Sequence, residues 1–157
     1  MRIVARPPDA EAFEPFGGFL VPPDRAGERV HFSPWLEPVH DLSLQSHLNH
    51  VPASDLPLTL DQVEHHPHAA QLFLPVGVSR YVVTVLPSRP DGSPDEAGAL
   101  AFVVPGRIGV AYRPGVWHAG ITVLDHAASF AVHMWRGATD DDVFASIPTL
   151  RIDGVEA

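Results

Sequence analysis

At residues 63–75 the sequence reads Val-Glu-His-His-Pro-His-Ala-Ala-Gln-Leu-Phe-Leu-Pro, an acid and three histidines followed by an apolar run. Side chains of an extended chain alternate between two faces, so Glu64, His66 and His68 would share one face. His65 would lie on the other face. The apolar run indicates a buried strand. We interpret the segment as a polar cluster at the mouth of a β-barrel; the alternative is a histidine-rich loop without chemistry.

Short apolar segments separated by proline and glycine turns make up the rest of the chain. Arg80–Leu86 is rich in β-branched residues and predicts a central strand. Further strands are predicted over residues 2–5, 19–21, 39–50, 56–63, 100–104, 109–112, 120–124 and 129–134. Asp9 is suited to cap one short helix over residues 10–16, which Gly17 and Gly18 would end. The pattern predicts a single all-β domain over residues 1–157, a small antiparallel barrel with one N-terminal helix.

Composition excludes several classes of function. The 157 residues contain no cysteine and no lysine, which excludes thiol nucleophiles, disulfides and lysine imines. A net charge of −9 argues against a nucleic-acid partner, and no apolar run reaches the roughly 18 residues of a membrane helix. The N-terminus lacks the pattern of a signal peptide, so a cytoplasmic location is expected. Ten histidines are the main acid/base groups near neutral pH.

A second polar cluster follows the turn at Pro114-Gly115, where Trp117 and His118 are predicted to point to opposite sides of a strand. This segment resembles the second motif of the cupins, whose barrels hold a ligand or metal ion in the mouth. His66, His68 and Gln71 resemble a loose form of the first cupin motif. A divalent-ion site formed by His66, His68 and His118 is therefore one alternative.

The longer match is to the ureidoglycolate lyases of allantoin catabolism, a branch of purine degradation. Residues 63–67, Gln71 and residues 73–75 resemble the family signature Leu-Glu-Arg-His-Pro…Gln-x-Phe-x-Pro. Similar positions continue over most of the chain, including His40-Asp41-Leu42, Gly109-Val110, Tyr112 and Val116-Trp117-His118. The resemblance implies a cupin-like barrel (a double-stranded β-helix), a homodimer, and an enzyme that splits ureidoglycolate into glyoxylate and urea.

The chemistry of this reaction matches the residues present. Ureidoglycolate carries a hydroxyl, a carboxylate and a urea nitrogen on one carbon, so cleavage requires a base for the hydroxyl proton and an acid for the departing nitrogen. We predict His66 as general base, His118 as the partner that donates a proton or orients urea, and Glu64 as a supporting carboxylate. Spacing alone does not decide which histidine is the acid. The reaction needs no cofactor.

Candidate substrate-binding residues come from the same matched segments. Gln71 and Tyr112 could hydrogen-bond the ureido group and the hydroxyl. Arg136, which keeps the arginine of the family, is the first candidate for the substrate carboxylate. Arg80 and Arg113 are alternatives. His40 and Trp117 are the remaining candidate substrate-binding residues.

Two other functions remain open from the sequence. One is a metal-dependent cupin enzyme. The other is a non-catalytic binder of small acids, suggested by positions 65, 70 and 135, where the chain departs from the pattern of the family. The acidic run Asp140-Asp141-Asp142 is predicted to be a solvated turn or a helix start rather than a metal site.

Overall fold

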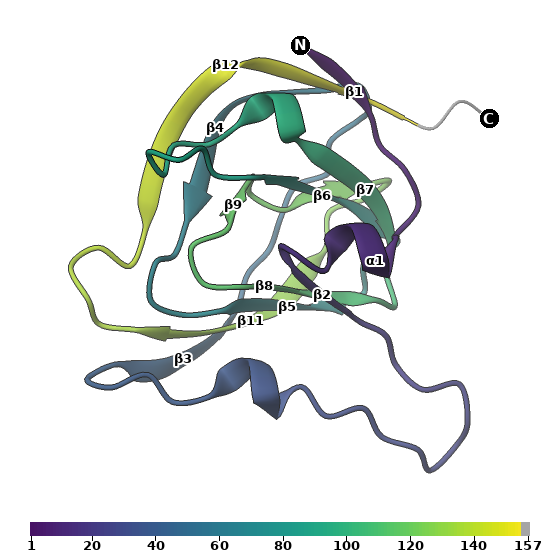
Figure 1. Ribbon diagram of the computed structural model, residues 1–157. Helices are drawn as coiled ribbons and strands as arrows, with labels where there is room; N and C mark the ends of the chain where they lie inside the picture. The colour runs from purple at the N-terminus through teal and green to yellow at the C-terminus, as the bar shows by residue number, and fades with distance from the viewer. Residues whose placement is uncertain (155–157) are drawn as a thin grey trace.

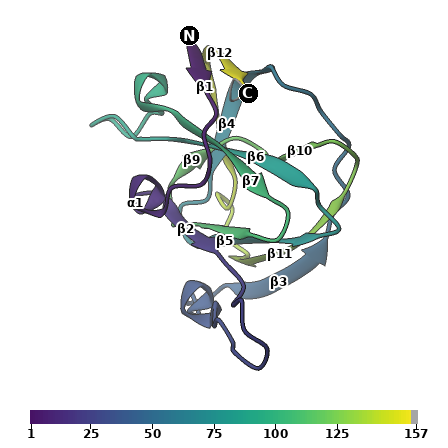
Figure 2. The same ribbon diagram turned by 90° about the vertical axis from the view of Figure 1, so that its right-hand side faces the viewer.

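Two β-sheets face each other and curl into a half-barrel (Figures 1 and 2). The computed structural model describes residues 1–154. The seven-stranded sheet has the order β1 (Arg2–Val4), β12 (Val143–Asp153), β4 (Leu58–His65), β9 (Trp117–His118), β6 (Arg80–Leu86), β10 (Thr122–Leu124), with β7 (Leu100–Pro105) paired to β6. The five-stranded sheet has the order β2 (Gly17–Leu20), β8 (Gly109–Tyr112), β5 (Gln71–Val76), β11 (Ser129–Arg136), β3 (Ser43–Leu48). The predicted all-β, cupin-like architecture is confirmed.

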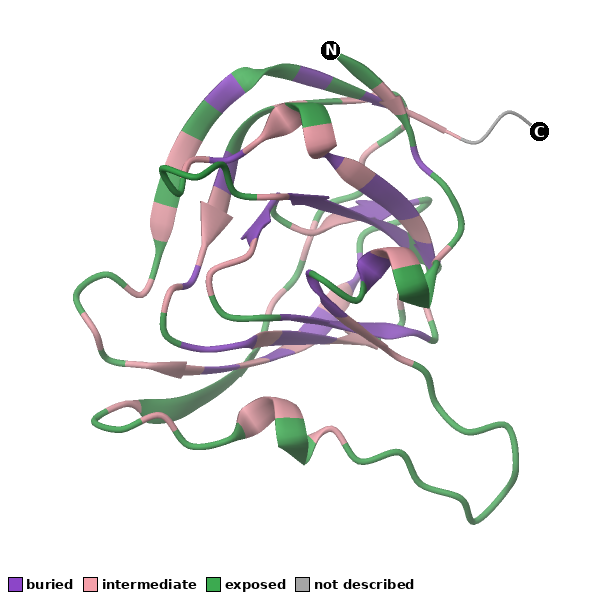
Figure 3. Cartoon of the chain, in the orientation of Figure 1, coloured by how far each residue is buried: buried purple, intermediate pink, exposed green. Residues whose placement is uncertain are grey.

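β6 is a central strand, as its β-branched sequence predicts. It pairs with β7, β9 and β10, and residues 81–86 are all buried (Figure 3). Tyr81 and Val85 on its inward face pack in one apolar cluster with Phe73 and Phe130 of the facing sheet. This inner cluster holds the two sheets together.

A second apolar cluster, the outer cluster, lies on the opposite face of the seven-stranded sheet. It includes Val63, Leu86, Trp117 and Leu150. Neighbouring residues of a strand face opposite sides, so burial of Trp117 in the outer cluster directs His118 toward the inside of the half-barrel.

The N-terminal helix is shorter than predicted. Asp9 caps α1 (Ala10–Phe13) by accepting a hydrogen bond of 3.0 Å from the N–H of Ala12. The helix ends at Phe13 rather than Phe16, because Pro15 lacks the N–H that would continue the helical hydrogen bonds. Gly17 begins β2 instead of ending the helix. Two 3-10 helices, η1 (Ser33–Leu36) and η2 (Glu96–Gly98), complete the helical elements, and no helix within residues 1–154 is long and apolar enough to cross a membrane.

The predicted strand over residues 39–50 forms only as Ser43–Leu48, and it is not half-buried as its alternation suggests. All six residues of β3 are exposed, with Leu44 and Leu48 at 43% and 73%. The reason is its position: β3 is the edge strand of its sheet, and within residues 1–154 it pairs with β11 alone.

The longest strand, β12, is absent from the sequence prediction. Its eleven residues include Pro148, which interrupts the alternation expected of a strand. In the structure the pairing of β12 with β4 shifts register between Ser146 and Leu150. This irregularity accommodates a residue that has no N–H to donate.

Gly17→Ala should lower the free energy of unfolding by about 1–3 kcal/mol, the usual cost of overpacking. A Cβ at Gly17 would lie 1.8 Å from the backbone oxygen of Ala111 and would push β2 away from β8. Gly120→Ala is the matched control, because a Cβ there has no described atom within 4 Å. Urea denaturation of both variants measures the difference, and equal stabilities would contradict the close packing of β2 against β8.

Candidate active site

Glu64, His66 and His118 meet on the inward face of the seven-stranded sheet. Glu64 on β4 lies directly opposite His118 on β9, and Glu64 Oε1 is 3.6 Å from His118 Nε2. His66 directly follows β4, and its ring centroid is 5.1 Å from that of His118. One oxygen or nitrogen of each residue lies within 4.8 Å of the other two. The structure therefore brings together the three residues for which the sequence predicts catalysis.

Trp117 lies outside this cluster, although it is a candidate substrate-binding residue in the sequence analysis. Its ring packs against His65, with 4.0 Å between centroids, and its indole N–H donates to the carbonyl of Gly92 at 2.9 Å. Burial lowers the pKa of His65. Both rings lie on the outer face of the sheet, where alternation directs them, so Trp117 supports the fold rather than the site.

Two further candidate histidines also lie away from the cluster. His68 pairs with Asp140, at 2.6 Å between Nε2 and Oδ1, because the strand ends before Pro67 and its alternation does not continue. His40 pairs with Asp41 at 3.0 Å, and both side chains are almost fully exposed. These two residues form a turn in which Asp41 has a φ of 64°, which brings neighbouring side chains together as a strand could not.

His118 is neutral and has one free ring nitrogen. Its Nδ1–H donates to the carbonyl of Val116 at 2.9 Å, so Nε2 carries the lone pair. Nε2 is buried and has no hydrogen-bond partner among the described residues. The ring stacks on Tyr112 at 4.1 Å. Burial, followed by the nearby imidazoles of His66 and His65, lowers the pKa of His118 to about 3.

His66 has oxygen atoms at both ring nitrogens. Nδ1 lies 2.9 Å from the carbonyl oxygen of Asp141 and 3.0 Å from Oδ1 of Asp142. Nε2 lies 3.0 Å from Oε1 of Gln71. These acceptors suit an imidazole that carries a proton on Nδ1, and a second proton on Nε2 would also find an acceptor.

The carboxyl group of Glu64 and the phenol of Tyr112 lie next to His118. Burial raises the pKa of Glu64, against the opposing effect of the nearby His66. Burial also raises the pKa of Tyr112, so that its hydroxyl keeps its proton. That hydroxyl is buried without a hydrogen-bond partner among the described residues, and it is free to bind a substrate oxygen.

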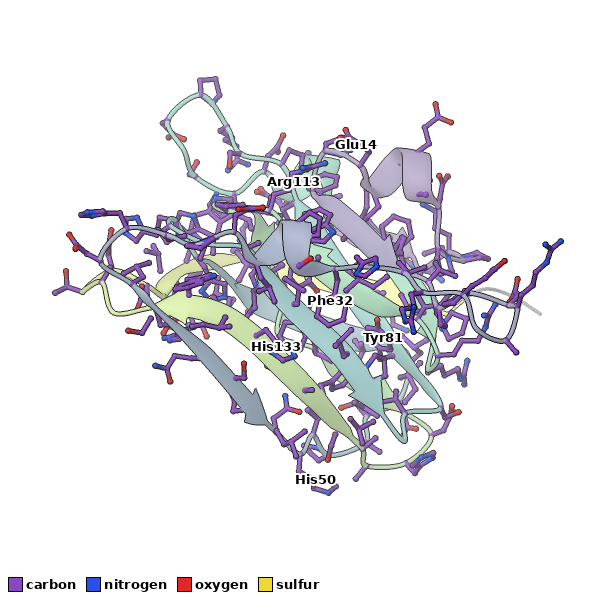
Figure 4. All side chains as sticks on the ribbon, turned by 90° about the horizontal axis from the view of Figure 1, so that it is seen from below. Glu14, Phe32, His50, Tyr81, Arg113 and His133 are labelled. Carbon is purple, nitrogen blue, oxygen red and sulfur yellow. The ribbon has the colours of Figure 1, made fainter. Side chains whose placement is uncertain are left out.

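Arg136 is close to the cluster but already paired. Both of its terminal nitrogens contact the carboxylate of Asp142, and this ion pair lowers the pKa of Asp142. The other two candidate arginines are engaged elsewhere. Arg80 pairs with Asp125, and Arg113 pairs with Glu14, both of which are labelled in Figure 4. Of the three, Arg136 is the one whose ion pair adjoins the cluster, through the contact of Asp142 with His66.

An open pocket of about 550 Å³ adjoins the turn that contacts His66. Its lining residues are Ser43, Gln45, His47, Arg136, Gly137 and Asp141. Strand register links it to the cluster, since Tyr112, Gln71, Met134 and Gln45 lie side by side on β8, β5, β11 and β3. Residues paired in this way share one face of a sheet. The row connects the strand that carries Tyr112 with Gln45 at the pocket.

Comparison with known proteins identifies the family. The family model described as ureidoglycolate lyase matches residues 1–148. The chain belongs to the ureidoglycolate lyase family. It is 31% identical to the ureidoglycolate lyase of Escherichia coli (strain SMS-3-5 / SECEC), over 94% of this chain and 96% of that protein. It is 30% identical, with the same coverage, to the ureidoglycolate lyases of Escherichia coli O157:H7 and Shigella boydii serotype 18. The family resemblance predicted from the sequence is confirmed.

Sequence reasoning missed two residues that contact this cluster. The acidic run forms a turn, as predicted, but the Asp141 carbonyl and the Asp142 carboxylate contact His66. The signal available in the sequence was the position of the run, a few residues after Arg136. Because β12 was not predicted, there was no reason in the sequence to place that turn next to His66, which lies 75 residues before Asp141.

The same cluster could hold a divalent ion. A carboxylate and two imidazoles are common ligands of Zn²⁺, Fe²⁺ and Ni²⁺, and Nε2 of His118 offers a buried lone pair without another partner. The donor set differs from the metal alternative drawn from the sequence. Glu64 takes the place of His68, which pairs with Asp140 instead.

The buried neutral His118 should make the protein less stable in acid. Its pKa is lower in the folded protein than the ordinary value near 6.5, so the unfolded chain binds the extra proton and stability falls as the pH drops below about 6.5. Between pH 7 and pH 4, with chelator present, wild type should lose roughly 3 kcal/mol more stability than His118→Phe. Denaturation of both proteins at the two pH values measures this, and equal losses would contradict a neutral buried imidazole.

Proposed function

We propose that this protein cleaves ureidoglycolate into glyoxylate and urea at the cluster of Glu64, His66 and His118. The observation that carries the proposal is Nε2 of His118, which is buried without a hydrogen-bond partner among the described residues and lies beside a carboxylate and a second imidazole. Membership in a lyase family supports an enzyme over the binding-only alternative.

The contacts of the two histidines support a division of roles opposite to the one predicted from the sequence. Nε2 of His118 has no hydrogen-bond partner among the described residues, whereas both ring nitrogens of His66 face acceptors. In the proposed mechanism, Nε2 of His118 takes the hydroxyl proton while the C–O bond gains double-bond character. The C–N bond breaks, its electron pair goes to nitrogen, and His66 gives that nitrogen a proton. Glu64 Oε1, 3.6 Å from Nε2, stabilises the positive charge that develops on His118.

Three polar groups are available to bind the rest of the substrate. The carboxamide of Gln71 is complementary to a urea group, and the unpartnered hydroxyl of Tyr112 can donate to a substrate oxygen. Arg136 would bind the substrate carboxylate while it keeps its contact with Asp142. The net effect is an orientation in which the hydroxyl faces His118 and the urea nitrogen faces His66.

His118→Ala and His66→Ala should each lower kcat for glyoxylate release by about 10²-fold or more, the scale of lost acid/base catalysis. His68→Ala is the matched control, because this histidine lies in the same segment but pairs with Asp140 on the surface. Both enantiomers of ureidoglycolate should be tested, with spontaneous decay subtracted. A similar loss in all three variants, or no loss in any, would count against the cluster as the site of cleavage.

A metal-assisted version of the reaction is the second candidate, since the three donor atoms lie within 4.8 Å of one another. An ion held there would polarise the hydroxyl oxygen of the substrate. Metal analysis of untagged protein, together with activity before and after chelation, separates the two versions. Full activity in metal-free protein supports direct acid/base catalysis; activity that is lost and then restored by a divalent ion supports the metal.

We also propose a cytoplasmic homodimer. The lack of cysteine suits a reducing compartment, which fractionation of expressing cells would test. Support for the dimer comes from β3, whose backbone edge is unpaired on one side and whose Leu44 and Leu48 are exposed.

Leu48→Glu should shift the protein from dimer to monomer in sedimentation experiments, because a charge would enter an apolar contact between copies. Val4→Glu is the control, because Val4 is similarly exposed on the other sheet. A wild-type protein that sediments as a monomer, or a Leu48→Glu variant that stays dimeric, would rule out this surface.

A further inference from the structure

We propose that Asp142 is a positioning residue for His66, which holds the ring in place and keeps a proton on Nδ1. The reacting nitrogen is then Nε2. This inference rests on the proposed function, since it gives the acidic turn a part in the same reaction. The turn itself lies between β11 and β12, outside the segments from which the catalytic residues come.

The contacts at Nδ1 of His66 decide its protonation. Oδ1 of Asp142 is 3.0 Å away and the carbonyl oxygen of Asp141 is 2.9 Å away. A carbonyl oxygen can only accept, and the carboxylate is held ionised by the guanidinium of Arg136. Nδ1 must therefore be a donor, and Nε2 is the ring nitrogen on the side of Gln71, whose Oε1 also accepts.

The turn is built to hold these acceptors still. Arg136 grips the Asp142 carboxylate through both terminal nitrogens. The Asp141 carboxylate accepts from the backbone N–H groups of Gly137 at 2.7 Å and Ala138 at 3.2 Å. Two carboxylates thus fix the turn at both ends, and the turn fixes the imidazole.

Asp142 lies on the far side of the ring from the reacting nitrogen, because its Oδ1 contacts Nδ1 while Nε2 faces Gln71. The carboxylate acts through the ring and contacts no reacting atom.

A purely structural role would give a different result on mutation. The Asp142 side chain is 35% exposed, and partly exposed ion pairs contribute little to stability. Its removal should therefore change catalysis much more than folding. Asp140 provides the comparison, because it lies in the same turn but pairs with the exposed His68.

Asp142→Asn and Asp140→Asn are the test variants. An asparagine in place of Asp142 has one acceptor group and one donor group. Its NH₂ must therefore face either Arg136 or Nδ1–H of His66, and either contact places two hydrogen-bond donors against each other. Asp142→Asn should lower kcat about 10–100-fold with KM changed less than about threefold and the melting temperature nearly unchanged. Asp140→Asn should stay within about twofold of wild type in both constants.

A spectroscopic measurement separates this inference from the proposed function. Nitrogen-15 NMR of the imidazole, through a pH titration, reports which ring nitrogen of neutral His66 carries the proton. We expect the proton on Nδ1 in wild type and in Asp140→Asn, and a substantial Nε2–H population in Asp142→Asn. An unchanged tautomer in Asp142→Asn, or an unchanged kcat in active protein, would overturn the inference. If wild type releases no glyoxylate, the proposed function fails and the NMR result alone decides whether Asp142 positions His66.

Discussion

The pairing of β4 with β9 is the constraint on which the site depends. β9 has only two residues, and it lies between β4 and β6 with Glu64 opposite His118. A slip of one residue would turn His118 outward and Trp117 inward. Trp117 prevents this slip, since its ring is buried in the outer cluster and its N–H is bonded to Gly92. Burial of one large side chain is worth roughly 1.5–3 kcal/mol, enough to favour one register strongly.

Burial then gives the cluster its chemistry. It raises the pKa of Glu64 and lowers that of His118, and both changes favour the uncharged forms. His66 is in a different environment, with the charged Asp142 and the Asp141 carbonyl beside Nδ1. Two imidazoles only 5.1 Å apart thus lie in different surroundings, that of His118 stacked on Tyr112 and that of His66 beside a carboxylate.

The sequence was sufficient where local pattern determines structure. Alternation correctly put Glu64 and His66 on one face with His65 on the other, and β-branched residues correctly predicted β6. The sequence was not sufficient where contacts between distant segments determine the structure. β12 was not predicted because Pro148 breaks its alternating pattern, and without β12 the contact between Asp142 and His66 could not be predicted either. Trp117 and His40 lie in segments that match the family, but neither lies at the cluster. Similarity of a segment does not show on which face of a strand each side chain lies.

In the proposed reaction one bond is cleaved, the C–N bond between the glyoxylate carbon and urea. The most direct measurement is the product balance when purified wild-type protein consumes ureidoglycolate, with urea, ammonia and glyoxylate each quantified by NMR or enzymatic assay. We predict one urea for each glyoxylate and no ammonia, because the site transfers protons within the substrate and hydrolyses no amide. Release of ammonia in place of urea, or no consumption above spontaneous decay, would contradict it.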